Sequence, residues 1–329
     1  MSAPFQHRHA AHCESGTVAN LLSHHGLPVS EPMAFGLAAA LSFAYLPFVK
    51  IQEMPLIAYR LPPRAIIRGV RKPLGVDFRI ERFRSEAAGE ARLDALLDQG
   101  VAVGLQTSVY WLPYFPEDMR FHFNAHNLVV YGREGDDYLI SDPVGELPVR
   151  CHRDDLRRAR FAKGMLAPRG TLYFPEAIAA APTLRPEAVR AAIRRVAWTM
   201  QAPLPIFGAG GIRGLARGIA RLDPATPDSS RFVGHIVRMQ EEIGTGGAGF
   251  RFLYAAFLQE AAEAAGLPQL AEFSNRLMEV GDEWRGFALA AARMVKGRDA
   301  FDPPAIAQLL HALAAREAGF FRDLKAALP

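Results

Sequence analysis

Apolar residues recur at helical spacing in two short segments at the start of the chain. Between Cys13 and Gly26 they fall on one helical face, and the glycine is a typical stop signal, so a helix is expected from Cys13 onward. A serine followed by Glu-Pro predicts a second helix that begins at Ser30 and continues through Tyr45. Cys13 therefore occupies a predicted helix N-terminus.

Alternating and continuous apolar stretches predict strands in the following hundred residues. VDFRIERF, residues 76–83, and VAVGLQTSVYWL, residues 101–112, are typical of strands, with an amphipathic helix expected at residues 87–100. Residues 126–143 predict two strands joined by a polar turn, and residues 170–174 predict one more strand. The first half of the chain is thus expected to be α+β, with helices first and antiparallel strands later.

The second half has an alanine-rich helical pattern. Residues 175–187 carry three prolines and no periodic apolar face, so we expect a domain boundary near residues 175–185 and divide the chain into domains 1–178 and 179–329. Helices are expected in the second domain at residues 187–200, 229–243, 250–265, 267–295 and 304–327. The expected fold is an α+β domain followed by an all-α domain.

Composition narrows the class of protein. Of the 329 residues, 50% are hydrophobic and 22% are charged, which is typical of a globular protein. The net charge of +4 is spread along the chain without a dense basic tract, which argues against a nucleic-acid binder. Met1 to Gln6 is not apolar, and no run approaches the roughly 20 apolar residues of a membrane span, so a cytoplasmic protein without membrane attachment is expected.

The two cysteines, Cys13 and Cys151, are too few for a disulfide framework, so each is expected to be a free thiol. A helix N-terminus lowers the pKa of a thiol, and a nucleophilic cysteine needs a histidine that a third group orients. His126 begins one strand of the predicted hairpin and Asp142 ends the other, so antiparallel pairing brings both to one sheet edge. Cys13, His126 and Asp142 are therefore the candidate catalytic residues, in the chain order of papain-like enzymes.

Each of these residues also has an interpretation without chemistry. Cysteines are often buried and inert, and a strand histidine or an Asp-Pro turn is common. His122, four residues before His126, competes with it as general base. Cys151 with His152 is a second thiol beside an imidazole, but it precedes a basic helical segment and is interpreted as a structural thiol.

A zinc site near the N-terminus is a further alternative. Its ligands would be His7, His9, His12, Cys13, Cys151 and His152. The usual spacing of paired zinc ligands is absent from these positions, so no metal is expected.

The residues around Cys13 and His126 resemble the N-terminal domain of the butirosin-biosynthesis H acyltransferase family. The resemblance covers HCESGTVANLLSHHGLPVSEPMAFGLAAALSFAYLP, residues 12–47, and AHNLVVYGREGDDYLISDP, residues 125–143. The matching positions are His12-Cys13, Asn20, Gly26, Ser30-Glu31, Phe35-Gly36-Leu37, Phe43, Tyr45, His126 and Asp142-Pro143. GTGGAGFRFLYAAFLQEAA, residues 244–262, resembles the helical domain that often follows. The chain departs from the family pattern at Ala38 and Ala40, where glycines are expected.

The resemblance implies a papain-like domain that moves an acyl chain from a carrier-protein thioester, through a Cys13 thioester, onto an amine. Its partners would be an acyl carrier protein, or a related thioester donor, and a small-molecule amine in a natural-product pathway, with no resident cofactor. A cysteine hydrolase, either an amidase or a peptidase, would use the same residues, and a papain-like fold that only binds is a third interpretation. A homodimer is left open.

Several residues are weaker candidates for substrate binding. Gln6 is a candidate side-chain donor to the oxyanion, beside the backbone N–H of Cys13. Tyr110 and Tyr114, in the YWLPYF stretch, would line an acyl pocket or pack in the core. Gly246, Gly247 and Arg251 would hold the phosphate of a phosphopantetheine arm, with a plain helix-helix turn as the alternative.

Overall fold

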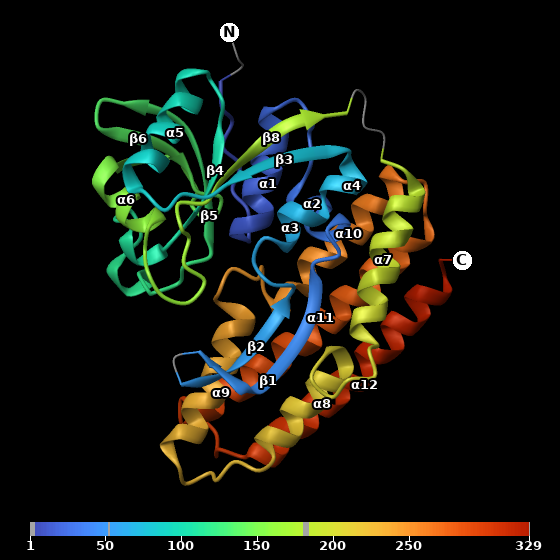
Figure 1. Ribbon diagram of the computed structural model, residues 1–329. Coiled ribbons are helices and arrows are strands. Elements are labelled where there is room, and N and C mark those ends of the chain that lie inside the picture. The colour runs from blue at the N-terminus through green and yellow to red at the C-terminus, as the bar shows by residue number, and fades with distance from the viewer. Residues whose placement is uncertain (1–3, 52, 180–183, 329) are drawn as a thin grey trace. The chain divides into compact units, whose positions relative to one another are not determined.

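The computed structural model divides into two compact units, the first made of Met1–Ala34 and Pro63–Thr183 and the second of Phe35–Pro62 and Leu184–Pro329 (Figure 1). The structure describes residues 4–51, 53–179 and 184–328, so residues 180–183 of the expected boundary lie outside the described residues. The predicted fold class, an α+β region followed by an all-α region, is confirmed. Residues 35–62, expected from the sequence to belong to the first domain, cluster with the second unit.

The first unit is built on a six-stranded antiparallel sheet with the strand order β3-β8-β4-β5-β6-β7. The strands are β3 (Val76–Glu81), β4 (Val103–Thr107), β5 (His126–Glu134), β6 (Asp137–Ser141), β7 (Val149–His152) and β8 (Leu172–Ile178). The hairpin predicted at residues 126–143 is present as β5 and β6. Antiparallel pairing places the start of β5 beside the end of β6.

Helices cover both faces of this sheet. They are α1 (Cys13–His24), the start of α2 (Glu31–Leu37), α3 (Ala65–Gly69), α4 (Arg71–Leu74), α5 (Glu86–Asp98) and α6 (Arg153–Arg160). Side chains of α5 and α6 share one apolar core with Val103 and Leu105 of β4. Gly104 lies between these two on the opposite face, where an added Cβ would come within 2.9 Å of Leu21 in α1. Thus α1 packs on the face away from α5 and α6.

The second unit is helical except for one antiparallel hairpin, β1 (Leu41–Ile51) with β2 (Met54–Arg60). Its helices are the end of α2, α7 (Pro186–Met200), α8 (Gly208–Ile219), α9 (Pro227–Glu241), α10 (Arg251–Ala264), α11 (Gln269–Val295) and α12 (Pro303–Ala326). Five of these correspond to the helices predicted from the sequence. The helix α8 was not predicted, because glycines at several of its positions are poor helix formers and tertiary packing overrides that preference.

The helix predicted from Ser30 through Tyr45 was too long. It ends at Leu37, Ala39 has a left-handed backbone with φ of 53°, and β1 begins at Leu41. Alanine is a strong helix former, but cross-strand pairing with β2 decides the conformation here. A close approach is present at Gly36 of the same segment, where an added Cβ would lie 2.0 Å from the Phe257 ring.

Candidate active site

The N-terminus of α1 holds Cys13 at the first helical position, with 6% of its surface exposed. The preceding turn is clamped by the carboxylate of Glu31, which accepts hydrogen bonds from the backbone N–H groups of Ala11 and His12, each at 2.8 Å. The Ser15 hydroxyl donates to the same carboxylate at 2.9 Å. The His12 side chain caps the helix by accepting from the backbone N–H of Ser15. The predicted helix start at Cys13 is confirmed.

The structure brings Cys13, His126 and Asp142 together. His126 begins β5, Asp142 follows the end of β6, and the His126 Nε2 donates to Asp142 Oδ2 at 2.6 Å. The Cys13 thiol lies beside the same ring and acts on its pKa. Because Nε2 serves Asp142, Nδ1 is the ring nitrogen available to the sulfur. His126 therefore connects a thiol at a helix N-terminus with a buried carboxylate.

The Asp142 carboxylate is held by two further donors. The Tyr114 hydroxyl donates to Oδ2 at 2.8 Å, and the backbone N–H of Val144 donates to Oδ1 at 3.2 Å. Pro143 lies closely against α1, since a Cβ added to Gly16 would come within 2.6 Å of the Pro143 Cβ. These contacts hold Asp142 beside His126 and set the first turns of α1 next to it.

The electrostatics of this group favour a charged imidazole. Burial opposes a charge on His126, but the Asp142 carboxylate and the hydrogen bonds to Asp142 and Cys13 together raise the pKa of His126 to about 10. Burial, followed by the charge of Asp142, raises the pKa of Tyr114 well above its usual range, so this phenol stays protonated and donates. An imidazolium beside a thiol at a helix N-terminus stabilises the thiolate.

One oxyanion donor is available from the backbone. The N–H of Cys13, at the first position of α1, has no acceptor within the helix. Gln6, the predicted second donor, is exposed in the segment before α1 and lies outside the buried network. Its neighbour His7 binds Ser141 Oγ at 2.7 Å and the Gly145 carbonyl at 3.1 Å, which anchors that segment to the Asp142 loop.

The two predicted tyrosines have different environments. Tyr114 supports Asp142, so its hydroxyl is used inside the network and does not line an acyl pocket. Tyr110 is 40% exposed and lines a pocket with Trp111. His122, the competing general base, is exposed and stacks on Tyr110 with ring centroids 4.0 Å apart. The structure therefore favours His126 over His122 beside the thiol.

The phosphate site predicted at Gly246, Gly247 and Arg251 is wrong. The Arg251 side chain is fully buried in the second unit and pairs with Glu317 through Nε at 2.7 Å. The glycine-rich loop already holds an internal carboxylate, because the backbone N–H of Ala248 donates to Glu241. The backbone N–H of Gly247 donates to the Thr245 hydroxyl. These donors are therefore occupied by the chain itself.

Two alternatives remain, a reactive thiol at Cys151 and a zinc site near the N-terminus, and the surroundings of these residues favour neither. Cys151 is 2% exposed in β7, and burial, with the charges of Asp155 and Asp137, raises the pKa of its thiol to about 12, so it is an unreactive thiol at neutral pH. His12 caps α1 and His7 binds Ser141, so these two histidines point to different partners. Within residues 4–51, 53–179 and 184–328, no three His, Cys, Asp or Glu side chains gather as a metal site.

The supporting roles of three residues were not identified from the sequence. The positioning roles of Glu31 and Tyr114 depend on contacts across many residues, although Glu31 lies in the stretch that carries the family resemblance. Tyr173, whose hydroxyl donates to Asn127 Oδ1 at 2.9 Å, is the third. Burial, then the charges of Glu14 and Cys13, raises its pKa, which places this phenol near the thiol.

Comparisons with known proteins identify both parts of the chain. Residues 12–143 match the family described as butirosin biosynthesis protein H, N-terminal, and residues 154–324 match the domain of unknown function DUF4872. The search of the curated proteins gave no match. In the described part of the chain, no helix has the length and apolar character needed to cross a bilayer. With both of its domains present in their expected order, the chain belongs to the butirosin biosynthesis protein H family.

Proposed function

We propose that the chain is a cysteine-dependent acyltransferase, which takes an acyl group from a carrier-protein thioester onto Cys13 and passes it to an amine. Family membership relates the chain to secondary-metabolite biosynthesis. The observation that carries the proposal is the buried group of Cys13, His126 and Asp142, in which His126 is hydrogen-bonded to Asp142 and lies beside the Cys13 thiol. This group has the parts that a thiol nucleophile needs: a base, an orienting carboxylate and a helix N-terminus.

In the first step, His126 takes the proton of Cys13, and the thiolate attacks the acyl carbonyl of the donor. The Cys13 backbone N–H stabilises the oxyanion of the tetrahedral intermediate. The intermediate collapses with loss of the donor thiolate, which receives the proton from His126. The products are an acyl-Cys13 thioester and a free donor thiol, so this exchange is nearly balanced in free energy.

In the second step, the amine attacks the acyl-Cys13 carbonyl, and His126 accepts the amine proton. The Cys13 thiolate leaves beside the imidazolium, and the product is an amide. An amide is more stable than a thioester, so this step gives the reaction its direction. Asp142, held by Tyr114 and Val144, keeps the imidazole in one tautomer throughout both steps.

The test is acyl capture by the protein. Incubation with acyl-phosphopantetheine carrier protein, or with a simple acyl thioester, is expected to add one acyl mass to a peptide that contains Cys13. Cys13→Ala is expected to abolish the adduct. Cys151→Ala, a matched removal of the other thiol, is expected to retain it. Addition of primary amines is then expected to discharge the adduct faster than water, with amide formation.

The outcomes separate the alternatives. Discharge by water alone, without preference for amines, would identify a cysteine hydrolase. Absence of an adduct, together with equally slow alkylation of Cys13 and Cys151 by iodoacetamide at neutral pH, would identify a protein that only binds.

A further inference from the structure

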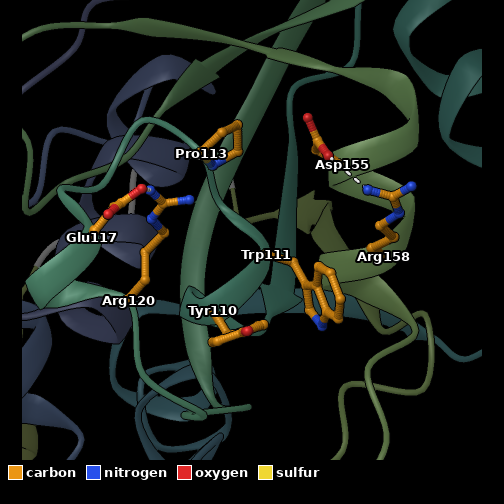
Figure 2. Close-up of a pocket in the computed structure, with 7 residues that line it drawn as sticks. All are labelled: Tyr110, Trp111, Pro113, Glu117, Arg120, Asp155 and Arg158. Atoms are coloured by element: carbon orange, nitrogen blue, oxygen red, sulfur yellow. Dashed lines mark hydrogen bonds and ion pairs between the residues drawn. The ribbon is translucent and has the colours of Figure 1, made fainter.

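A pocket of about 400 Å³ opens in the first unit, and none of its lining residues belongs to the Cys13–His126–Asp142 network (Figure 2). Its walls are formed by Tyr110, Trp111, Pro113, Glu117, Arg120, Asp155 and Arg158. The volume lies in the range of small-molecule sites, roughly 300–1,000 Å³. We call it the Trp111 pocket.

Two aromatic rings, nearly perpendicular to each other, lie in the wall of this pocket. Trp111 is 37% exposed, and its ring meets Tyr110 edge to face with centroids 5.0 Å apart. His122 stacks on Tyr110, and the Arg158 guanidinium lies 5.8 Å from the centre of the Trp111 ring. Rings held by such contacts keep their orientation. Trp111 therefore presents a preformed face on which a planar ligand stacks, with Tyr110 at the edge of that ligand.

The two arginines of the pocket are only loosely paired. Figure 2 shows Glu117 with Arg120 on one side and Asp155 with Arg158 on the other. The shortest distance from nitrogen to oxygen is 3.5 Å in the first pair and 3.4 Å in the second, beyond a good charge-assisted hydrogen bond. Arg92, by contrast, donates to Glu81 at 3.0 and 2.9 Å.

Arg120 also carries an unused donor. Its Nε is buried and has no hydrogen-bond partner among the described residues. A buried guanidinium N–H without an acceptor is costly, and a carboxylate or phosphate would satisfy both Nε and a terminal nitrogen in the forked geometry that arginine prefers. Its own partner Glu117 is 94% exposed, so that carboxylate is free to turn toward solvent.

We propose that the Trp111 pocket binds a small molecule that carries a carboxylate or phosphate on a flat ring. The oxyanion lies at Arg120 and Arg158, and the ring stacks on Trp111 with its edge toward Tyr110. Glu117 and Asp155 keep the pocket close to neutral, which favours one compact oxyanion over a polyanion. The proposal concerns binding alone and does not depend on reactivity at Cys13.

The test uses four probes against the full chain labelled with 5-fluorotryptophan, whose Trp111 signal is identified in a Trp111→Phe variant. Benzoate and phenyl phosphate are expected to bind and to shift that signal, and their relative affinity distinguishes carboxylate from phosphate ligands. Inorganic phosphate, which lacks the ring, is expected to bind at least roughly tenfold more weakly. Benzylamine, which has the ring but the opposite charge, is expected not to bind.

Matched variants assign the contacts. Arg158→Gln and Arg120→Gln are each expected to weaken phenyl phosphate binding by about tenfold or more, because each removes a charge-assisted hydrogen bond. Arg231→Gln is the control, since Arg231 forms a similar helical pair with Asp228 in the second unit. Circular dichroism of each variant checks that it is folded, and Arg158, 57% exposed, tests the proposal if Arg120→Gln does not fold.

Unchanged affinity in Arg158→Gln, binding of benzylamine as strong as that of benzoate, or no response of the Trp111 signal to any probe would each overturn the proposal. None of these measurements requires acyl transfer. A chain that binds phenyl phosphate but forms no acyl-Cys13 would retain this pocket and lose the proposed function, and the reverse result would separate them equally well.

Discussion

Each unit of the molecule buries a charged network, and the two differ in how completely they are satisfied. In the second unit Arg251 and Glu317 are both 0% exposed, and the guanidinium donates through Nε and a terminal nitrogen to Glu317 and through the other to the Gly249 carbonyl. The Trp284 Nε1–H donates to the same carboxylate at 2.7 Å. All three guanidinium nitrogens therefore have acceptors inside the unit.

In the first unit, His126 and Asp142 are nearly as buried, at 5% and 2% exposure of their side chains. This network ends at the Cys13 thiol beside His126 and at the Cys13 N–H, which has no acceptor within its helix. Burial of charge is common to both networks, so it does not mark a site. The first network differs in having a titratable group at an end where hydrogen-bonding capacity is left over. This difference, and not burial, distinguishes a candidate active site from a structural ion pair.

Disrupting the Cys13–His126–Asp142 network is expected to give the largest effect, a loss of reactivity at Cys13. Asp142→Asn removes the charge that sustains the His126 imidazolium and offers the ring the wrong tautomer. We expect the single-turnover acylation of Cys13 to slow by about 10³- to 10⁴-fold, as for other nucleophile–histidine–carboxylate sites. The measurement is acyl-enzyme formation by mass spectrometry. Asp98→Asn, at an exposed partner of Arg133, is the control, and equal rates in the two variants would contradict the assignment.

Disrupting the buried network of Arg251, Glu317 and Trp284 is expected to lower the free energy of unfolding. Glu317→Gln leaves the Arg251 charge buried and unpaired, which costs about 3–5 kcal/mol in the free energy of unfolding. Urea denaturation measures the loss. Asp299→Asn, which breaks the exposed ion pair with Arg293, is the matched control and is expected to cost far less. Similar losses in both variants would show that the buried pair has no special structural role.

The stability contributed by the His126–Asp142 pair should also depend on pH. The pKa of His126 is raised to about 10 in the folded chain, above the roughly 6.5 of a free imidazole. The folded chain therefore holds the proton more tightly, and this stabilisation is full below about pH 6.5 and is lost as pH rises from there through about 10. We expect the stability difference between the wild type and Asp142→Asn to shrink over this window. A constant difference would contradict the ion pair.

The smallest expected effect is at Tyr114, which acts on Asp142 and does not touch the thiol. Tyr114→Phe removes one hydrogen bond from the carboxylate, which makes Asp142 a stronger acceptor and raises the pKa of His126 further. We expect a change of about threefold to tenfold in acylation rate, equivalent to one ordinary hydrogen bond. NMR titration of the His126 ring separates this positioning role from general destabilisation, since simple destabilisation would leave the pKa unchanged.

The candidate site was more predictable from the sequence than its surroundings. Antiparallel pairing of a hairpin is a local rule, so His126 and Asp142 were placed together before the fold was known. The helix start at Cys13 followed from spacing and a stop glycine. The roles of Glu31 and Tyr114 could not be predicted from the sequence, because they depend on hydrogen bonds to residues 19 and 28 positions away in the chain.

The errors arose where local preference and tertiary packing disagree. Alanines at 38–40 predicted a continuing helix, and the chain turns there instead to form β1. The glycine-rich loop before α10 has the appearance of an anion site, and it does bind an anion, but the carboxylate is its own Glu241. A sequence pattern indicates what a segment is able to bind, and only the fold tells whether a neighbour already fills that position.

The assignment of residues 35–62 to the second unit affects how the protein is made. This hairpin leaves the ribosome early, while the helices that it packs with are encoded more than a hundred residues later. During synthesis its strand edges stay unprotected, which exposes the nascent chain to aggregation until the C-terminal helices emerge. A fragment that begins after residue 183 would lack the hairpin altogether, so expression of the helical part alone requires these 28 residues to be joined to it.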